Sequence, residues 1–105
     1  RLNKKALKNI PPWFDEGLAM QNDYREQYSQ EVWKEKTNNG KNAIPLEEMD
    51  TPAEFYAGTS DDRRFRYVNA KHEVSEWMEI HGQNGLLELF DNLNDGEDFN
   101  IAYKN

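Results

Sequence analysis

The chain of 105 residues contains no cysteine. Disulfide bonds and thiolate metal sites are therefore excluded, and redox chemistry does not indicate the cellular compartment. The sequence also lacks a signal-peptide pattern, and it begins with Arg1 rather than methionine. From these two absences we expect a piece of a longer or processed protein.

Positive charge is scarce as well, because 20 Asp and Glu residues outnumber 13 Lys and Arg residues and give a formal net charge of -7. Phosphate binding needs a basic face, so nucleic acid is not expected as a partner. An anionic membrane surface is disfavoured on the same ground, and no apolar run approaches the roughly 20 residues of a membrane-spanning helix. Aromatic residues, at 12%, still supply apolar surface for one modest core.

Alternating apolar and polar residues, which would predict β-strands, are missing, whereas helical spacing is frequent. We therefore predict an all-α protein of about five helices, organised as a single helical domain over residues 1–105. A first helix should end at Pro11-Pro12, because proline removes a backbone donor. Further helices are expected over about residues 12–36 with a break after Asn22, from Thr51 to Gly58, from Ser60 to Gly82, from Leu86 to Gly96 and from Phe99 onward. A turn or a flexible loop is expected over about residues 37–43.

Catalytic motifs are equally sparse, with no glycine-rich phosphate loop and no arguable nucleophile set. The segment His72-Glu73-Val74-Ser75-Glu76 approaches the zinc-binding pattern HExxH, in which two histidines at i and i+4 share a helix face. Glu76 stands where the second histidine is needed, and His81 is not placed on that row. An exposed i, i+4 pair beside a core stripe explains the segment more simply than a metal site.

A cluster of acidic and amide residues surrounds Gly96 and resembles a calcium loop in composition. Its members are Asp91, Asn94, Asp95, Glu97 and Asp98. The regular ligand spacing and the closing glutamate of an EF-hand are missing. We expect a connection between two helices at this position.

One stretch near the N-terminus is not explained by composition, namely Pro11-Pro12-Trp13-Phe14-Asp15-Glu16-Gly17-Leu18-Ala19. As a helix start, it would bury Trp13 and Phe14 and place two carboxylates favourably in the first turn. Gly17 then costs about 1 kcal/mol relative to alanine within a helix. A glycine is understandable there if something bulky approaches that helix face, so both a helix start and a functional site stay open.

The segment Pro12–Ala19 resembles the P-x-W-hydrophobic-x-E-G-L-A element of the peptidase MA-like, or gluzincin-type, zinc metallopeptidases. Three later segments are similar to elements that follow it in that family, in the same order. They are Ile44–Met49, Tyr67–Val74, and Gly82–Leu93 continued by Gly96–Ala102. The resemblance covers about Ile10 to Tyr103, and E-G-L-A is its most specific element.

This resemblance implies that Glu16 is the third ligand of a catalytic zinc, while two histidines and a base glutamate come from HExxH. The chain contains no HExxH, so the motif is expected upstream of Arg1. The chain would then be the C-terminal helical subdomain of a zincin-like fold. Gly17 would allow the HExxH helix to approach, and Tyr67 is the candidate for oxyanion stabilisation, with a core aromatic as the alternative.

The leading hypothesis is therefore the helical half of a zinc-dependent metallopeptidase that acts on a peptide or protein substrate. Zinc is expected in the longer protein, and this chain alone is expected to bind none and to be inactive. The alternatives are a non-catalytic scaffold of the same fold and an unrelated acidic helical protein-interaction module. Since many relatives are exported or membrane-attached, the resemblance implies an extracellular or cell-envelope location.

Overall fold

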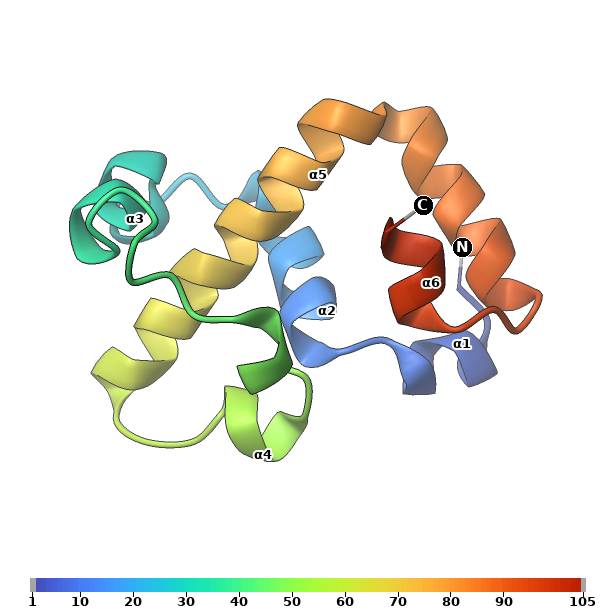
Figure 1. Cartoon of the computed structure of the whole chain (residues 1–105), viewed down its shortest axis with the longest axis horizontal. Helices are drawn as coiled ribbons and strands as arrows, with labels where there is room; N and C mark the ends of the chain where they lie inside the picture. The colour runs from blue at the N-terminus through green and yellow to red at the C-terminus, as the bar shows by residue number, and fades with distance from the viewer. Residues whose placement is uncertain (1, 105) are drawn as a thin grey trace. The chain divides into compact units, whose positions relative to one another are not determined.

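The computed structural model describes residues 2–104, and every regular element in that range is helical (Figure 1). The predicted all-α class is confirmed. The α-helices are α1 (Lys4–Asn9), α2 (Pro12–Ala19), α3 (Gln30–Lys36), α4 (Pro52–Phe55), α5 (Ser60–Asn94) and α6 (Phe99–Lys104). Single 3-10 turns lie at Met20–Asn22, Glu26–Tyr28 and Leu46–Glu48. None of the helices within residues 2–104 has the length and apolar character needed to cross a bilayer.

The chain forms two compact units, which we describe separately. The Pro11–Glu76 unit contains α2, α3, α4 and the first part of α5. The terminal unit combines the chain up to Ile10 with the chain from Trp77 onward, so it contains α1, the second part of α5 and α6.

The core of the Pro11–Glu76 unit is aromatic and aliphatic. Its buried hydrophobic side chains are Trp13, Phe14, Met20, Met49, Phe55, Val68, Ala70 and Val74. Those of α5 follow helical spacing, as the stripe in the sequence predicted. Burial of such side chains is the main favourable term in folding, so this stripe fixes which face of α5 meets α2 and α4.

The helix expected over residues 12–36 is interrupted, as the predicted break after Asn22 indicated. Asp23 competes with helix formation, because its carboxylate accepts hydrogen bonds from the backbone N–H of Arg25 at 3.1 Å and from the Arg25 guanidinium at 2.6 Å. The helical path resumes at α3, where the Ser29 hydroxyl caps the helix by accepting from the N–H of Val32 at 3.2 Å.

The segment after α3 forms a tight turn. Asn38, Asn39 and Gly40 all have positive φ, at 53°, 58° and 92°. The buried Thr37 organises them, since its hydroxyl donates to the Trp33 carbonyl at 2.6 Å and accepts from the Gly40 N–H at 2.9 Å. The Asn and Gly composition correctly predicted a turn at this position.

The terminal unit is held together by stacked aromatic rings and by its own polar contacts. Trp77 on α5 lies 5.2 Å from Tyr103 on α6, with only 13° between the ring planes, and its indole N–H donates to the Tyr103 carbonyl at 3.0 Å. Near the N-terminus, Asn3 caps α1 and its backbone N–H donates to Asn94 Oδ1 at 2.8 Å.

α5 contains a kink at Gly82, where φ is 69° and ψ is -173°. This conformation is accessible essentially only to glycine, because a side chain would clash with the backbone. The prediction that the helix beginning at Ser60 stops at Gly82 is confirmed in this sense. The next helical segment follows without a loop, and its inward side chains include Leu86, Leu89 and Leu93.

Candidate functional site

Glu16 lies on α2, whose start is fixed by Pro12 in the first turn. The preceding aromatic residues anchor the helix, since Trp13 and Phe14 are buried and the Trp13 indole N–H donates to Asp50 Oδ1 at 3.0 Å. Glu16 itself is half-buried, so its carboxylate sits at the edge of the core of the Pro11–Glu76 unit.

Two tyrosine hydroxyls meet on one oxygen of this carboxylate. Tyr56, directly after α4, donates to Glu16 Oε2 at 2.9 Å, and Tyr67 on α5 donates to the same atom at 3.3 Å. Within residues 2–104, Oε1 of Glu16 accepts no hydrogen bond. The carboxylate is therefore oriented through Oε2.

Both tyrosine rings are fixed by the fully buried Phe55. Its ring centroid lies 5.1 Å from that of Tyr56 and 5.3 Å from that of Tyr67, and both pairs meet nearly edge-on at 84° and 86°. Tyr28 adds a further edge contact to Tyr67 at 6.2 Å. Edge-to-face pairs of this kind are favourable and directional, so the hydroxyl positions follow from the packing.

The electrostatics keep both phenols protonated. Burial raises the pKa of Tyr56 to about 12, and the hydrogen bond to Glu16 and that residue's negative charge add to the effect. Burial, followed by the charge of Glu16, also raises the pKa of Tyr67. The pKa of the Asp15 carboxyl is raised too, by burial and then by the neighbouring Glu16.

Gly17 is explained by close packing of α2 against α5. A Cβ atom at this position would lie 2.5 Å from the Ala70 carbonyl oxygen and 2.7 Å from Val74 Cγ2. Something bulky does approach this helix face, as the glycine indicated. The neighbour is α5 of the same chain, which corrects the expectation that Gly17 makes room for an upstream HExxH helix.

The structure brings together the two site residues that the sequence singled out, Glu16 and Tyr67, although 51 positions separate them. Sequence reasoning did not single out Tyr56. The Thr51–Pro52 helix start could have indicated this residue, because it fixes where α4 begins and Tyr56 directly follows that short helix.

His72 and Glu76 form the i, i+4 pair that the sequence indicated, with 2.9 Å between His72 Nε2 and Glu76 Oε1. The prediction of an exposed pair is correct for Glu76, whose side chain is 63% exposed. It is wrong for His72, whose side chain is only 10% exposed because its ring stacks on Trp33. His81 stacks on Trp77 in the terminal unit. Across residues 2–104, no group of three His, Cys, Asp or Glu side chains is arranged to hold a metal ion.

The acidic segment around Gly96 connects α5 and α6, as expected. The Glu97 N–H donates to the Asn92 carbonyl at 3.1 Å and the Gly96 N–H to the Leu93 carbonyl at 3.0 Å, which closes the end of α5. The segment therefore serves as a helix connection.

Comparisons of the chain with protein-family models, with curated proteins and with solved structures give no match.

Proposed function

We propose that this chain is the helical half of a zinc-dependent metallopeptidase domain and that Glu16 is its zinc ligand. One observation carries the proposal, namely the carboxylate of Glu16 held at Oε2 by the hydroxyls of Tyr56 and Tyr67. Carboxylates that bind metals are typically oriented by such outer hydrogen bonds. A freely solvated carboxylate at a helix start would need neither tyrosine.

The residues of the chain fit part of such a site. A catalytic zinc takes three protein ligands and a water molecule, and a glutamate oxygen is an accepted ligand beside two histidines. Glu16 offers that oxygen, while the described residues offer no complete ligand group. The proposal therefore requires two histidines and a base from an HExxH segment outside residues 2–104, in keeping with the resemblance.

In the assembled site a bound zinc would lower the pKa of its water and polarise the carbonyl of a peptide substrate. Glu16 would hold the ion, and Tyr56 would keep the carboxylate in its orientation. Tyr67 would turn its single hydroxyl donor from Glu16 Oε2 to the oxyanion of the substrate and donate a hydrogen bond there. Its raised pKa supports this role, because a hydrogen-bond donor must stay protonated.

The coding sequence upstream of Arg1 provides the first test. We expect it to encode HExxH on a helix. The two histidines of that motif would then complete a zinc-ligand set with Glu16 as the third ligand. A start codon at that point, or a helix without the two histidines, would overturn the peptidase proposal and leave the non-catalytic scaffold.

The second test measures zinc in the longer protein by elemental analysis after dialysis. Glu16→Gln keeps the side-chain shape but removes the anionic ligand, so we expect zinc well below one ion per chain and loss of peptide hydrolysis. Asp15→Asn removes the neighbouring charge in the same helical turn and is the matched control, with zinc retained. Equal zinc content in Glu16→Gln and the parent, with helicity unchanged, would rule out the ligand role.

A further inference from the structure

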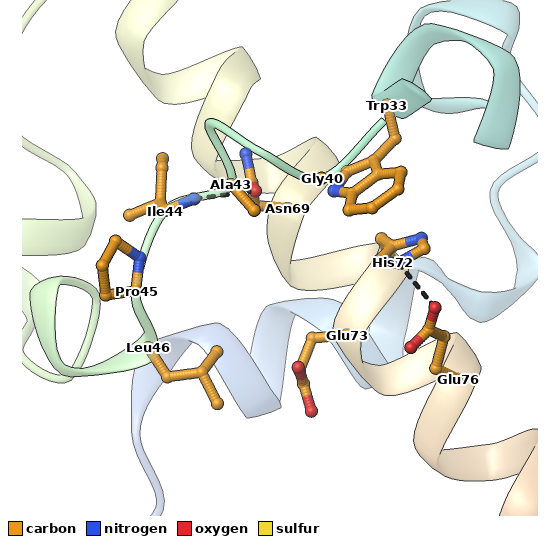
Figure 2. Close-up of a pocket in the computed structure, with 10 residues that line it drawn as sticks. All are labelled: Trp33, Gly40, Ala43, Ile44, Pro45, Leu46, Asn69, His72, Glu73 and Glu76. Atoms are coloured by element: carbon orange, nitrogen blue, oxygen red, sulfur yellow. Dashed lines mark hydrogen bonds and ion pairs between the residues drawn. The ribbon is translucent and has the colours of Figure 1, made fainter. Parts of the chain in front are cut away.

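A pocket of about 390 Å³ opens in the Pro11–Glu76 unit, between the turn after α3 and one face of α5 (Figure 2). It is lined by Trp33, Gly40, Ala43, Ile44, Pro45, Leu46, Asn69, His72, Glu73 and Glu76. Its volume is at the small end of the range for ligand sites, roughly 300–1,000 Å³. It therefore suits one side chain or a compact organic group.

The chain segment along one side of the pocket is pinned to α5 by a buried amide. Asn69, only 4% exposed, accepts a hydrogen bond from the Ile44 N–H at 3.1 Å and donates to the Phe65 carbonyl at 2.8 Å. This holds the apolar run Ile44–Leu46 opposite the helix, as Figure 2 shows. The pocket is thus a formed feature with an apolar wall.

Stacked rings make the end of the pocket. The Trp33 and His72 ring centroids lie 3.4 Å apart with 10° between the planes, and Gly40 closes over the indole. His72 Nδ1 is hydrogen-bonded to Gln30 Oε1 at 2.8 Å. His72 is consequently fixed on both sides, and its contact with Glu76 is fixed with it.

The wall of the pocket that α5 forms, opposite the Ile44–Leu46 segment, is anionic. Its charged members are Glu73 and Glu76, and among the described lining residues none is Lys or Arg. Two carboxylates outweigh the one imidazole of His72 whether that ring is neutral or protonated. Glu76 uses Oε1 for His72, and within residues 2–104 its Oε2 makes no hydrogen bond or ion pair.

We propose that this pocket binds the side chain of an arginine presented by a peptide. An arginine has an aliphatic stem that matches the Ile44–Leu46 wall, and its guanidinium suits the carboxylates of Glu73 and Glu76. Charge complementarity favours the same occupant, because the chain as a whole carries a net charge of -7.

The test is a titration of the chain with a blocked tripeptide that contains arginine, followed by the NMR signal of the Trp33 indole N–H. Trp33→Phe identifies that signal among the three tryptophans. We expect the signal to shift and saturate with the arginine peptide, and to stay in place with the analogue that carries uncharged citrulline. Equal shifts with both peptides, or none with either, would overturn the proposal.

Charge-removing variants locate the binding. Glu73→Gln and Glu76→Gln should each weaken binding about tenfold, the effect expected when one charge-assisted hydrogen bond is lost. Glu79→Gln, on an exposed position of α5 outside the pocket, removes the same charge and should leave the affinity unchanged. If Glu79→Gln weakens binding as much as the other two, the net charge and not the pocket attracts the peptide.

A free cation of the same chemistry separates the two sources of a guanidinium. Butylguanidinium, which carries the same single charge, should bind more weakly than the peptide, since it lacks the backbone; binding equal to that of the peptide would overturn the assignment to a peptide-borne side chain. These measurements use the chain without zinc and do not involve Glu16. Failure here is therefore distinct from failure of the metallopeptidase proposal.

Discussion

The two units of the molecule use their aromatic residues differently. In the terminal unit the rings stack nearly parallel, with 13° between Trp77 and Tyr103 and 19° between Phe99 and Tyr103. In the Pro11–Glu76 unit Trp33 and His72 also stack, but the rings beside Glu16 meet edge-on, since Phe55 lies at 84° and 86° to the two tyrosines next to it.

The difference lies in where the polar atoms of the rings are directed. The indole N–H of Trp77 is buried and is used by a carbonyl of the same unit, so this contact closes the packing. The hydroxyls of Tyr56 and Tyr67 converge instead on a single half-buried carboxylate oxygen. Aromatic residues alone do not indicate a site; the destination of their polar atoms does.

The largest effect should come from removing the stack in the terminal unit. Trp77→Ala deletes a buried ring and its hydrogen bond, and we expect a loss of about 3–5 kcal/mol in the free energy of unfolding. Urea unfolding followed by circular dichroism measures this loss. A loss below about 1 kcal/mol, the level of an exposed substitution, would contradict a structural role for the stack.

Two glycines sharpen the comparison next. Gly17→Ala forces a methyl group against Ala70 and should cost about 1–3 kcal/mol through overpacking. Gly82→Ala meets no atom within 4 Å, and its similar cost, about 1–3 kcal/mol, comes from the backbone conformation.

A double-mutant cycle distinguishes the two causes. Val74→Ala removes one of the atoms that Gly17→Ala would strike, so the two changes should cost less together than the sum of their separate effects. Combined with Gly82→Ala, the same change should be additive. Additivity in both cycles would mean that the Val74 side chain does not constrain Gly17.

The smallest effect concerns the tyrosine hydroxyls. Tyr56→Phe removes one hydrogen bond at a partly exposed position, which should cost about 0.5 kcal/mol at neutral pH. The phenol of Tyr56 has its pKa raised to about 12 from 10.0, so its contribution to stability is present below pH 10 and is lost as the pH rises toward 12. An ultraviolet titration at 295 nm should lose its highest-pH step in Tyr56→Phe.

Tyr24→Phe provides the control for that titration, because Tyr24 is 85% exposed. It should leave the highest-pH step in place. Loss of the highest step in this variant would assign the raised pKa to the wrong residue.

The sequence predicted those features that arise from local chemistry. Pro11-Pro12 separates α1 from α2, Thr51 and Pro52 start α4, and Gly82 interrupts α5, each through a conformational preference of the residue itself. The break at Asp23 has the same origin, because its carboxylate bonds to a backbone group two residues away.

Features that depend on contacts between distant segments could not be predicted. Tyr56 is 40 positions from Glu16, and Gln30 is 42 positions from His72, so no periodicity relates them. The pair His72–Glu76 was visible as a spacing, but the burial of His72 depends on Trp33, which comes from another helix. Packing decided these environments, and propensity did not.

The hydrogen bond between Gly40 and Thr37 also bears on the chemical lifetime of the chain. An asparagine followed by glycine loses ammonia when the glycine nitrogen attacks the asparagine side chain, and Asn39–Gly40 is such a pair. In the folded turn that nitrogen donates its proton to the Thr37 hydroxyl at 2.9 Å. Folding thereby engages the atom that would begin the ageing reaction, in a turn whose Gly40 lines the pocket.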